Sequence, residues 1–291
     1  MIITVASGKG GTGKTTIATS LALVIESRPL TFLDCDVETP NAHLFLHPEW
    51  QERREIGVLI PQVDAERCNG CGICAQVCQY HAIVVIGDKT LVFPELCHGC
   101  GSCTLNCPEQ AITEELHPLG FLERGYSDET IRDGNFSFAR GLLNVGEPMA
   151  VPVIRDLKNW QFSPETEIVI RDAPPGVSCP VVESMRGSDF ILLVTEPTPF
   201  GLHDLKLAHQ VVNELRIPAG VVINRDGIGD GDLDRYCQQA DLPILLRIPM
   251  RREIAEALAD GRPLVSVFPE YVPSFRNLYS EIHYLVQEAQ R

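Results

Sequence analysis

Nine residues, Gly8-Lys9-Gly10-Gly11-Thr12-Gly13-Lys14-Thr15-Thr16, decide the fold of this chain. An apolar run at 2–6 precedes them and another at 17–23 follows, which predicts a strand, a glycine-rich turn and a helix. That order is the context of a phosphate-binding loop, and Gly8 to Thr15 complete the pattern Gly-x4-Gly-Lys-Thr. Glycines let backbone N–H groups approach a phosphate, and the helix N-terminus adds positive partial charge. An ordinary glycine turn between strand and helix is the alternative.

The loop is expected to bind a nucleotide together with Mg²⁺. Lys14 is predicted to reach the β- and γ-phosphates, and the Thr15 hydroxyl to hold the ion. A second apolar strand ends at Asp172 and continues into Pro174-Pro175-Gly176, a Walker B and second-switch pattern. Asp172 is expected to hold a Mg²⁺-bound water and the Gly176 N–H to contact the γ-phosphate. The loop residues expected to bind ATP or ADP are Gly10, Gly11, Thr12, Gly13, Lys14, Thr15 and Thr16.

Lys9 lies inside the loop, directly after its first glycine. The run Lys-Gly-Gly-Thr-Gly-Lys-Thr-Thr resembles the deviant phosphate loop of the MinD/ParA/Mrp and nitrogenase iron-protein superfamily. In that superfamily the additional lysine reaches across a sandwich dimer, so the resemblance implies that Lys9 acts in trans. It also implies that Asp36, at the end of the strand 30–36, orients the attacking water or binds the Mg²⁺ shell, and that Asn224 recognises adenine. A solvated strand-end acid and a turn-forming asparagine are the plain alternatives for these two positions.

Eight of the eleven cysteines form two runs that repeat at an offset of 29 residues. Each run has the spacing Cys-x2-Cys-x2-Cys-x3-Cys, which is typical of bacterial two-cluster ferredoxins. In that arrangement the fourth cysteine of each run binds the other cluster. Two [4Fe-4S] clusters are therefore predicted, one held by Cys68, Cys71, Cys74 and Cys107, and the other by Cys97, Cys100, Cys103 and Cys78.

Two zinc sites are the alternative, because paired Cys-x2-Cys also binds zinc. Zinc needs only two such pairs per ion and leaves the repeated third and fourth cysteines without a use. The first run has Gln79 where proline usually follows the fourth cysteine, and this departure affects chain direction more than ligation. The other cysteines, Cys35, Cys179 and Cys237, are interpreted as small, partly buried thiols.

The cysteine-rich part interrupts the nucleotide-binding part of the chain. We expect a P-loop domain at 1–60 and 116–291, a doubly wound, mostly parallel α/β sheet, with a small α+β ferredoxin-like insert at 61–115. Insert domains prefer exposed loops with close ends, so the clusters are expected at the nucleotide edge. Residues 119–160 are hardest to interpret, and 128–132 could form a helical turn or an exposed acidic loop.

The formal net charge of −15 argues against a general nucleic-acid binder and against attachment to anionic membranes. No apolar run is long enough to span a bilayer, and no export signal is visible, so a cytoplasmic location is expected. Cytosolic thiols stay reduced, which favours metal ligation over disulfides.

These observations predict a slow or partner-stimulated ATPase, dimeric with itself or with a paralogous ATPase. Its nucleotide-dependent dimer switch is expected to drive electron transfer through the two clusters to an unidentified redox or iron–sulfur partner. Two alternatives stay open: an ATPase for iron–sulfur cluster assembly or carriage, and a ParA/MinD-like spatial-organisation ATPase with the clusters as redox sensors or structural staples.

Overall fold

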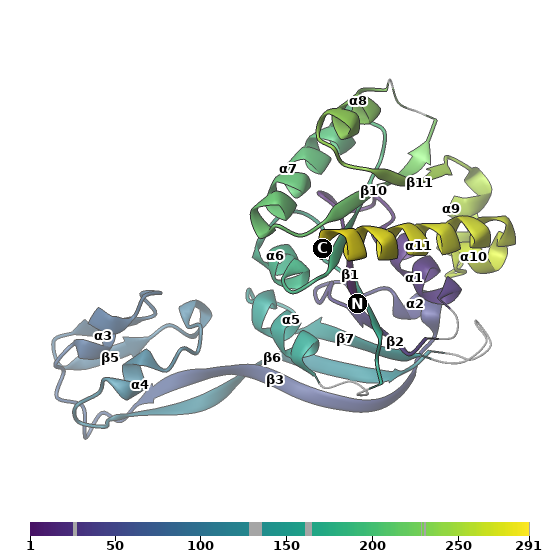
Figure 1. Ribbon diagram of the computed structural model, residues 1–291. Helices are drawn as coiled ribbons and strands as arrows, with labels where there is room; N and C mark the ends of the chain where they lie inside the picture. The colour runs from purple at the N-terminus through teal and green to yellow at the C-terminus, as the bar shows by residue number, and fades with distance from the viewer. Residues whose placement is uncertain (26–27, 128–135, 161–164, 228, 230, 291) are drawn as a thin grey trace.

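The fold is a long twisted α/β sheet with a projecting two-stranded ribbon (Figure 1). The computed structural model describes residues 1–25, 28–127, 136–160, 165–227, 229 and 231–290. The sheet order is β11-β10-β9-β1-β8-β2-β7-β6-β3. All pairs from β11 to β7 are parallel, and β6 is antiparallel to both β7 and β3. The strands are β1 Ile2–Ala6, β2 Leu30–Asp34, β3 Glu49–Val63, β6 Ile112–Tyr126, β7 Ser137–Leu143, β8 Ile168–Asp172, β9 Phe190–Thr195, β10 Ala219–Asp226 and β11 Ile244–Pro249.

Helices cover both faces of the parallel part of the sheet, as the continuous apolar strands predict. In β9, Phe190 and Leu192 pack on one face with α1 and α11, whereas Ile191 and Leu193 pack on the other with α6 and α7. The first face carries α1 Lys14–Val24, α9 Arg252–Ala259, α10 Leu264–Val267 and α11 Val272–Ala289, and the second α5 Ala150–Asn159, α6 Cys179–Met185, α7 Pro199–Leu215 and α8 Asp232–Gln239. Short turns of helix, α2 His43–Leu46 and η2 Pro269–Tyr271, complete the main body. The expected mostly parallel α/β sheet is confirmed.

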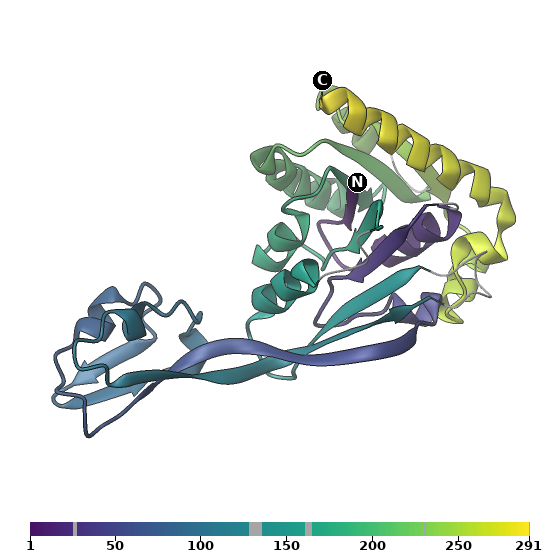
Figure 2. The same cartoon turned by 60° about the horizontal axis from the view of Figure 1, so that its bottom comes forward.

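The two chain segments that flank the cysteine-rich part form a β-ribbon. β3 and β6 pair from Glu49 opposite Tyr126 to Val63 opposite Ile112, but β7 pairs only with Gly120–Tyr126 of β6. The remainder of the two strands continues past the carboxyl end of β7 for roughly 20 Å, at ~3.3 Å per residue. Figures 1 and 2 show this ribbon holding the cysteine-rich segment away from the body.

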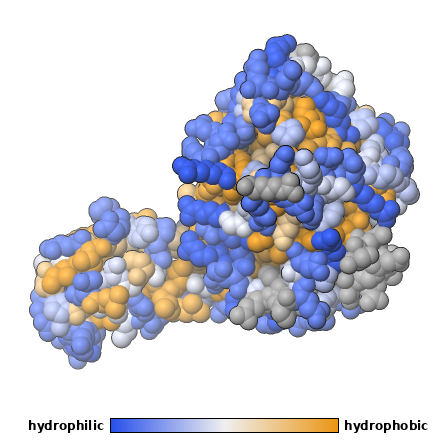
Figure 3. All heavy atoms as spheres, in the orientation of Figure 1, coloured by the Kyte–Doolittle hydropathy of each residue, from blue (hydrophilic) through white to orange (hydrophobic). Residues whose placement is uncertain are grey.

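The cysteine-rich module, residues 64–111, lies at the tip of the ribbon. It contains α3 Ile73–Val77, β4 Ile83–Ile86, β5 Lys89–Val92, η1 Pro94–Leu96 and α4 Ser102–Leu105. The expected boundaries at 61 and 115 fall inside β3 and β6, so a separate domain at 61–115 stays a prediction. Figure 3 shows apolar side chains on the surface of this module. Ile86 and Leu105 are two of its exposed apolar residues. The segment 128–132, for which two conformations were considered, lies outside the described residues.

Candidate nucleotide and metal sites

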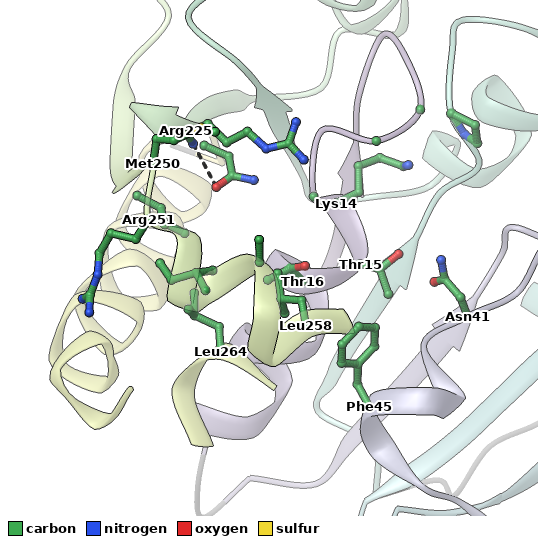
Figure 4. Close-up of a pocket in the computed structure, with 18 of the residues that line it drawn as sticks. Lys14, Thr15, Thr16, Asn41, Phe45, Arg225, Met250, Arg251, Leu258 and Leu264 are labelled. Carbon is green, nitrogen blue, oxygen red and sulfur yellow. Dashed lines mark hydrogen bonds between the residues drawn. The ribbon is translucent and has the colours of Figure 1, made fainter. Parts of the chain in front are cut away.

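The phosphate loop has the backbone that its glycines predict. Gly11 and Gly13 have φ of +78° and +92°, in the left-handed region, and Gly13 caps the first turn of α1. Gly8 is required by close packing, because a Cβ there would lie 2.2 Å from the carbonyl oxygen of Asp204. The loop borders a cavity of about 420 Å³ that extends past Asn41 and Phe45 to Leu258 and Leu264 (Figure 4).

A candidate cation site lies where α1 meets β8. The Thr15 hydroxyl donates to Asp172 Oδ2 at 2.6 Å, whereas the buried Asp172 Oδ1 has no hydrogen-bond partner among the described residues. Burial raises the pKa of Asp172 to about 6, although Lys14 and the Thr15 hydroxyl act in the opposite direction. A hydroxyl and an unsatisfied carboxylate oxygen are hard oxygen ligands, which suit Mg²⁺ or its bound water.

The end of β2 supplies two more carboxylates beside this point. Asp34 is fully buried and accepts the N–H groups of Asp36 and Ala42 at 3.2 and 3.0 Å, so it shapes the turn that follows β2. Asp36 lines the nucleotide cavity, and its pKa is raised by burial. The structure thus brings Lys14, Asp36 and Asp172 together, but whether Asp36 orients a water stays a prediction.

Lys9 is held within its own chain. Its Nζ lies 3.4 Å from Glu196 Oε2, and the other oxygen of Glu196 accepts a hydrogen bond from Arg225. Glu196 directly follows β9 and is buried, so one carboxylate anchors two cations at the rim of the cavity. Sequence reasoning missed Glu196 and Arg225, although a carboxylate at the end of a buried parallel strand is a usable signal. The trans role of Lys9 stays a prediction.

Two further expected residues make local contacts around the loop. Asn224 donates from Nδ2 to the Thr12 carbonyl at 2.8 Å, and its Oδ1 accepts the Arg225 N–H at 3.0 Å, the dashed bond in Figure 4. The Gly176 N–H donates to the Ser7 carbonyl at 2.9 Å. Contact of Gly176 with a γ-phosphate therefore requires this bond to break, and adenine recognition by Asn224 stays a prediction.

The eight repeated cysteines line two separate cavities in the module. Cys68, Cys71, Cys74 and Cys107 line one, hereafter site 1. Cys97, Cys100, Cys103 and Cys78 line the other, hereafter site 2. The structure thus groups the cysteines in the crossed combination that the spacing predicts.

Backbone N–H groups point at the crossed cysteines in both sites. Ala82 N donates to Cys78 Sγ and Ala111 N to Cys107 Sγ, each at 3.3 Å. Such bonds stabilise thiolates in iron–sulfur proteins. Among the described residues, no three Cys, His, Asp or Glu side chains are arranged to hold a single metal ion.

The remaining cysteines differ from one another. Cys35 and Cys237 are buried, and burial raises their pKa to about 12 and about 11. Cys179, at the start of α6, is exposed, so its interpretation as a partly buried thiol is wrong. Its neighbours Val177 and Ser178, at the end of the second-switch turn, are exposed as well. None of the helices in the described part of the chain is long and apolar enough to cross a membrane.

Comparisons with known proteins agree with the fold of the nucleotide-binding body. A model of the CobQ/CobB/MinD/ParA nucleotide-binding domain matches residues 3–264. An uncharacterized protein of Methanocaldococcus jannaschii is 34% identical over 79% of this chain and 82% of its own length. An iron–sulfur cluster carrier protein of Rickettsia bellii is 23% identical over 91% of this chain and 66% of its own length. Among solved structures, the septum site-determining protein MinD of Pyrococcus horikoshii, with Mg-ADP, is similar in fold, with a TM-score of 0.56, 19% identity and coverage of 99% and 98%.

Proposed function

Because the chain belongs to the CobQ/CobB/MinD/ParA nucleotide-binding family, we propose that it is an ATP-hydrolysing iron–sulfur protein. In this proposal Mg-ATP closes a dimer of the chain, and that switch drives electron transfer through two [4Fe-4S] clusters held by sites 1 and 2. The single observation that carries it is the sorting of eight cysteines into two four-cysteine cavities on a nucleotide-binding scaffold.

The nucleotide half of the proposal is supported by the residues around the phosphate loop. The buried Lys14 supplies a positive charge for the β- and γ-phosphates. Thr15 and the unpartnered oxygen of Asp172 would hold Mg²⁺, which polarises the phosphate oxygens when bound. Lys9 would leave Glu196 to reach a partner's nucleotide.

The metal half is supported by the chemistry of the two cysteine sites. Four thiolates around one cavity suit an iron–sulfur cluster, which supplies one-electron chemistry when bound. Cys74 and Cys103 share a small apolar core with Ile83 and Ile112, and this core limits the access of water. The N–H groups of Ala82 and Ala111 would stabilise the cluster charge.

A continuous apolar core joins the two halves. It contains Cys35 and Val37 of the first switch, continues through Leu119 to Val58, and ends at Cys97 of site 2. The Leu143 N–H also donates to the Val37 carbonyl at 2.8 Å, which ties the switch to β7. A movement of the first switch therefore has a packed route to the ribbon.

Cluster carriage is the second candidate function, favoured by the similarity to an iron–sulfur cluster carrier protein. We prefer electron transfer, because the duplicated frame of eight cysteines makes two four-cysteine sites, and passage of electrons from one cluster to another uses both. A spatial-organisation function of the MinD kind is supported only by the similarity in fold.

Anaerobic EPR of the reduced protein, with and without Mg-ATP, tests the proposal. We expect ATP to change the cluster signal or its midpoint potential in the normal protein but not in Lys14→Ala. Lys206→Ala, which removes an exposed lysine from α7, serves as the matched control and should respond normally. If two reduced clusters are seen but their EPR signals do not respond to ATP, the clusters act as structural elements or redox sensors. If no cluster signal is seen after reconstitution, the metal half of the proposal is refuted.

A further inference from the structure

The sequence repeat relates the two cysteine sites, but one pair of residues close to the cysteines differs in type between them. The residue after the first cysteine of each run is Asn69 or His98, and the second residue after the fourth cysteine is Tyr80 or Glu109. The crossing of the runs brings Asn69 and Glu109 to site 1, and His98 and Tyr80 to site 2. Equivalent positions thus carry a polar pair at one site and an aromatic pair at the other.

Each pair closes its cavity by joining the two halves of the repeat. The rings of Tyr80 and His98 stack with centroids 3.8 Å apart and an interplanar angle of 15°. At site 1, Asn69 Nδ2 donates to Glu109 Oε1 at 2.9 Å. A stacked aromatic pair presents apolar faces and excludes water, whereas an amide and a carboxylate attract water.

One pair of equivalent cysteines differs in burial in the same direction, whereas the other three pairs are buried to the same degree in both sites. Cys97 of site 2 is buried and packs with Val58 and Ile60 of the ribbon. Its counterpart at site 1, Cys68, is only half-buried, and its Sγ lies 3.5 Å from the Thr90 hydroxyl. Site 2 does contain one charged lining residue, Glu114, but its Oε1 accepts the Thr104 hydroxyl at 2.8 Å.

We propose that the two sites have unequal exchange rates: site 1 exchanges its iron and sulfide with external acceptors, and site 2, behind the Tyr80–His98 stack, retains them. This rests on the proposed function, in which both sites hold clusters. Exchange here would be ligand substitution, in which donor atoms of an acceptor replace the cysteine thiolates of site 1 on iron. The sulfide would leave with the iron, or as hydrogen sulfide where a chelator takes the iron alone. The freed thiolates take protons from water, and no net electron transfer occurs. The acceptor class is a molecule or protein with free thiolate or nitrogen donors.

The test follows iron release from the full, reconstituted protein. Bathophenanthroline disulfonate, a ferrous chelator, is added anaerobically with excess dithionite, which keeps the released iron ferrous. We expect release in two phases with roughly half of the iron in each, since the two clusters have equal iron content. The iron and sulfide content before addition is measured first. A protein that binds neither fails the proposed function, whatever the kinetics of exchange.

The repeat supplies its own matched variants. Exchanging the site 1 pair for that of site 2, Asn69→His with Glu109→Tyr, should slow the fast phase several-fold. The reverse exchange, Tyr80→Glu with His98→Asn, should accelerate the slow phase. Glu66→Tyr with Gln76→His, at exposed positions that line neither cavity, makes the same type of change and should leave both phases as they are.

The outcomes are distinguishable from one another. A fully loaded protein that releases iron in a single phase overturns the inequality of the sites. Two phases that do not respond to either exchange overturn the role of the two pairs. A variant that fails to load is identified by its iron content, and the opposite exchange then decides the result.

Discussion

Asp172 illustrates how a single residue can favour binding at the expense of stability. Its raised pKa, about 6 against an ordinary 3.8, means that the folded state takes up a proton more readily than the unfolded state. The charged carboxylate therefore lowers the free energy of unfolding above about pH 6, and this loss disappears as the pH falls toward 4. A bound Mg²⁺ would remove the loss by satisfying the free oxygen.

Asp172→Asn should accordingly raise the melting temperature of the nucleotide-free protein at pH 8 and abolish the further rise that Mg-ATP gives. The reason is that the amide carries no buried charge but is a poor Mg²⁺ partner. Thermal unfolding at pH 8 and pH 5, with and without Mg-ATP, measures both effects. Asp88→Asn, at an exposed turn, is the control. If Asp172→Asn is less stable than the normal protein without nucleotide, the buried charge of Asp172 does not lower the free energy of unfolding.

In the proposed function, Lys9 takes part in dimer formation and not in nucleotide binding by one chain. Because it pairs with Glu196 rather than lining the phosphate cavity, Lys9→Ala should leave ATP binding by one chain within a few-fold. The same variant should lose ATP-dependent dimers, whereas Lys14→Ala should lose binding itself. Light scattering after size separation, beside equilibrium nucleotide binding, distinguishes the two variants. Persistence of the ATP-dependent dimer in Lys9→Ala would rule out its trans role.

At this scale, the residues predicted from sequence are those that belong to local patterns. The phosphate loop and the cysteine runs each fix spacing within a short stretch, so their positions in the structure agree with expectation. Glu196 was missed because its partners, Lys9 and Arg225, are distant in sequence.

At the scale of elements, the β-ribbon is the main feature that the sequence conceals. The first half of β3 contains Glu49, Glu52, Arg53, Arg54 and Glu55, which resemble an exposed loop. These charges are stabilised by contacts with β6 and with the end of α5: Arg53 pairs with Glu123 at 3.5 Å, and Arg54 lies over the Trp160 ring at 5.3 Å. Such pairings join segments far apart in the chain, so periodicity alone cannot reveal them. By contrast, the end of α9 at Ala259 follows from a local signal, because Gly261 and Pro263 come just after it.

Helix α5 connects the second switch to the ribbon. Lys158 and Arg155 of α5 both pair with Glu183 of α6, at 3.1 and 3.6 Å, and α6 begins directly after the second-switch turn. Trp160, at the end of α5, is held by the ribbon arginines. α5 is therefore placed to transmit a movement of α6 to β3 and β6.

Glu183→Gln should reduce the effect of Mg-ATP on the cluster EPR signal while ATP binding is retained. Neutralising Glu183 removes the charge that both cations of α5 share, so α6 and α5 move less as a unit. Glu256→Gln, which breaks the exposed Arg252–Glu256 pair at 2.8 Å, is a matched control and should respond as the normal protein does. An undiminished ATP response in Glu183→Gln, with ATP bound, would exclude this route.

On the scale of the whole molecule, the nucleotide cavity and the cysteine sites depend on different parts of the core. No described residue of the ribbon or module lines the nucleotide cavity, and the cores around α1 and α7 contain no residue of 49–127. The core under α5, in contrast, extends from Leu33 to Cys97 and includes both body and module. The molecule is thus a nucleotide-binding body to which the module is attached through one core.

Replacing residues 57–118 with a short Asn-Gly turn should therefore leave a folded protein that binds Mg-ATP. The strands up to Ile56 and from Leu119 remain covered by β7 and α5, and Asn-Gly closes antiparallel strands. The free energy of unfolding should fall by a few kcal/mol at most, since about 25 cal/mol is lost per Å² of apolar contact between the removed segment and the body. Isothermal titration with Mg-ATP and thermal unfolding measure the two quantities, with Lys14→Ala in the same background as the non-binding control. If the folded truncation fails to bind Mg-ATP, the module shapes the nucleotide site. Because coupling free energies are reciprocal, nucleotide binding would then affect the module to the same extent.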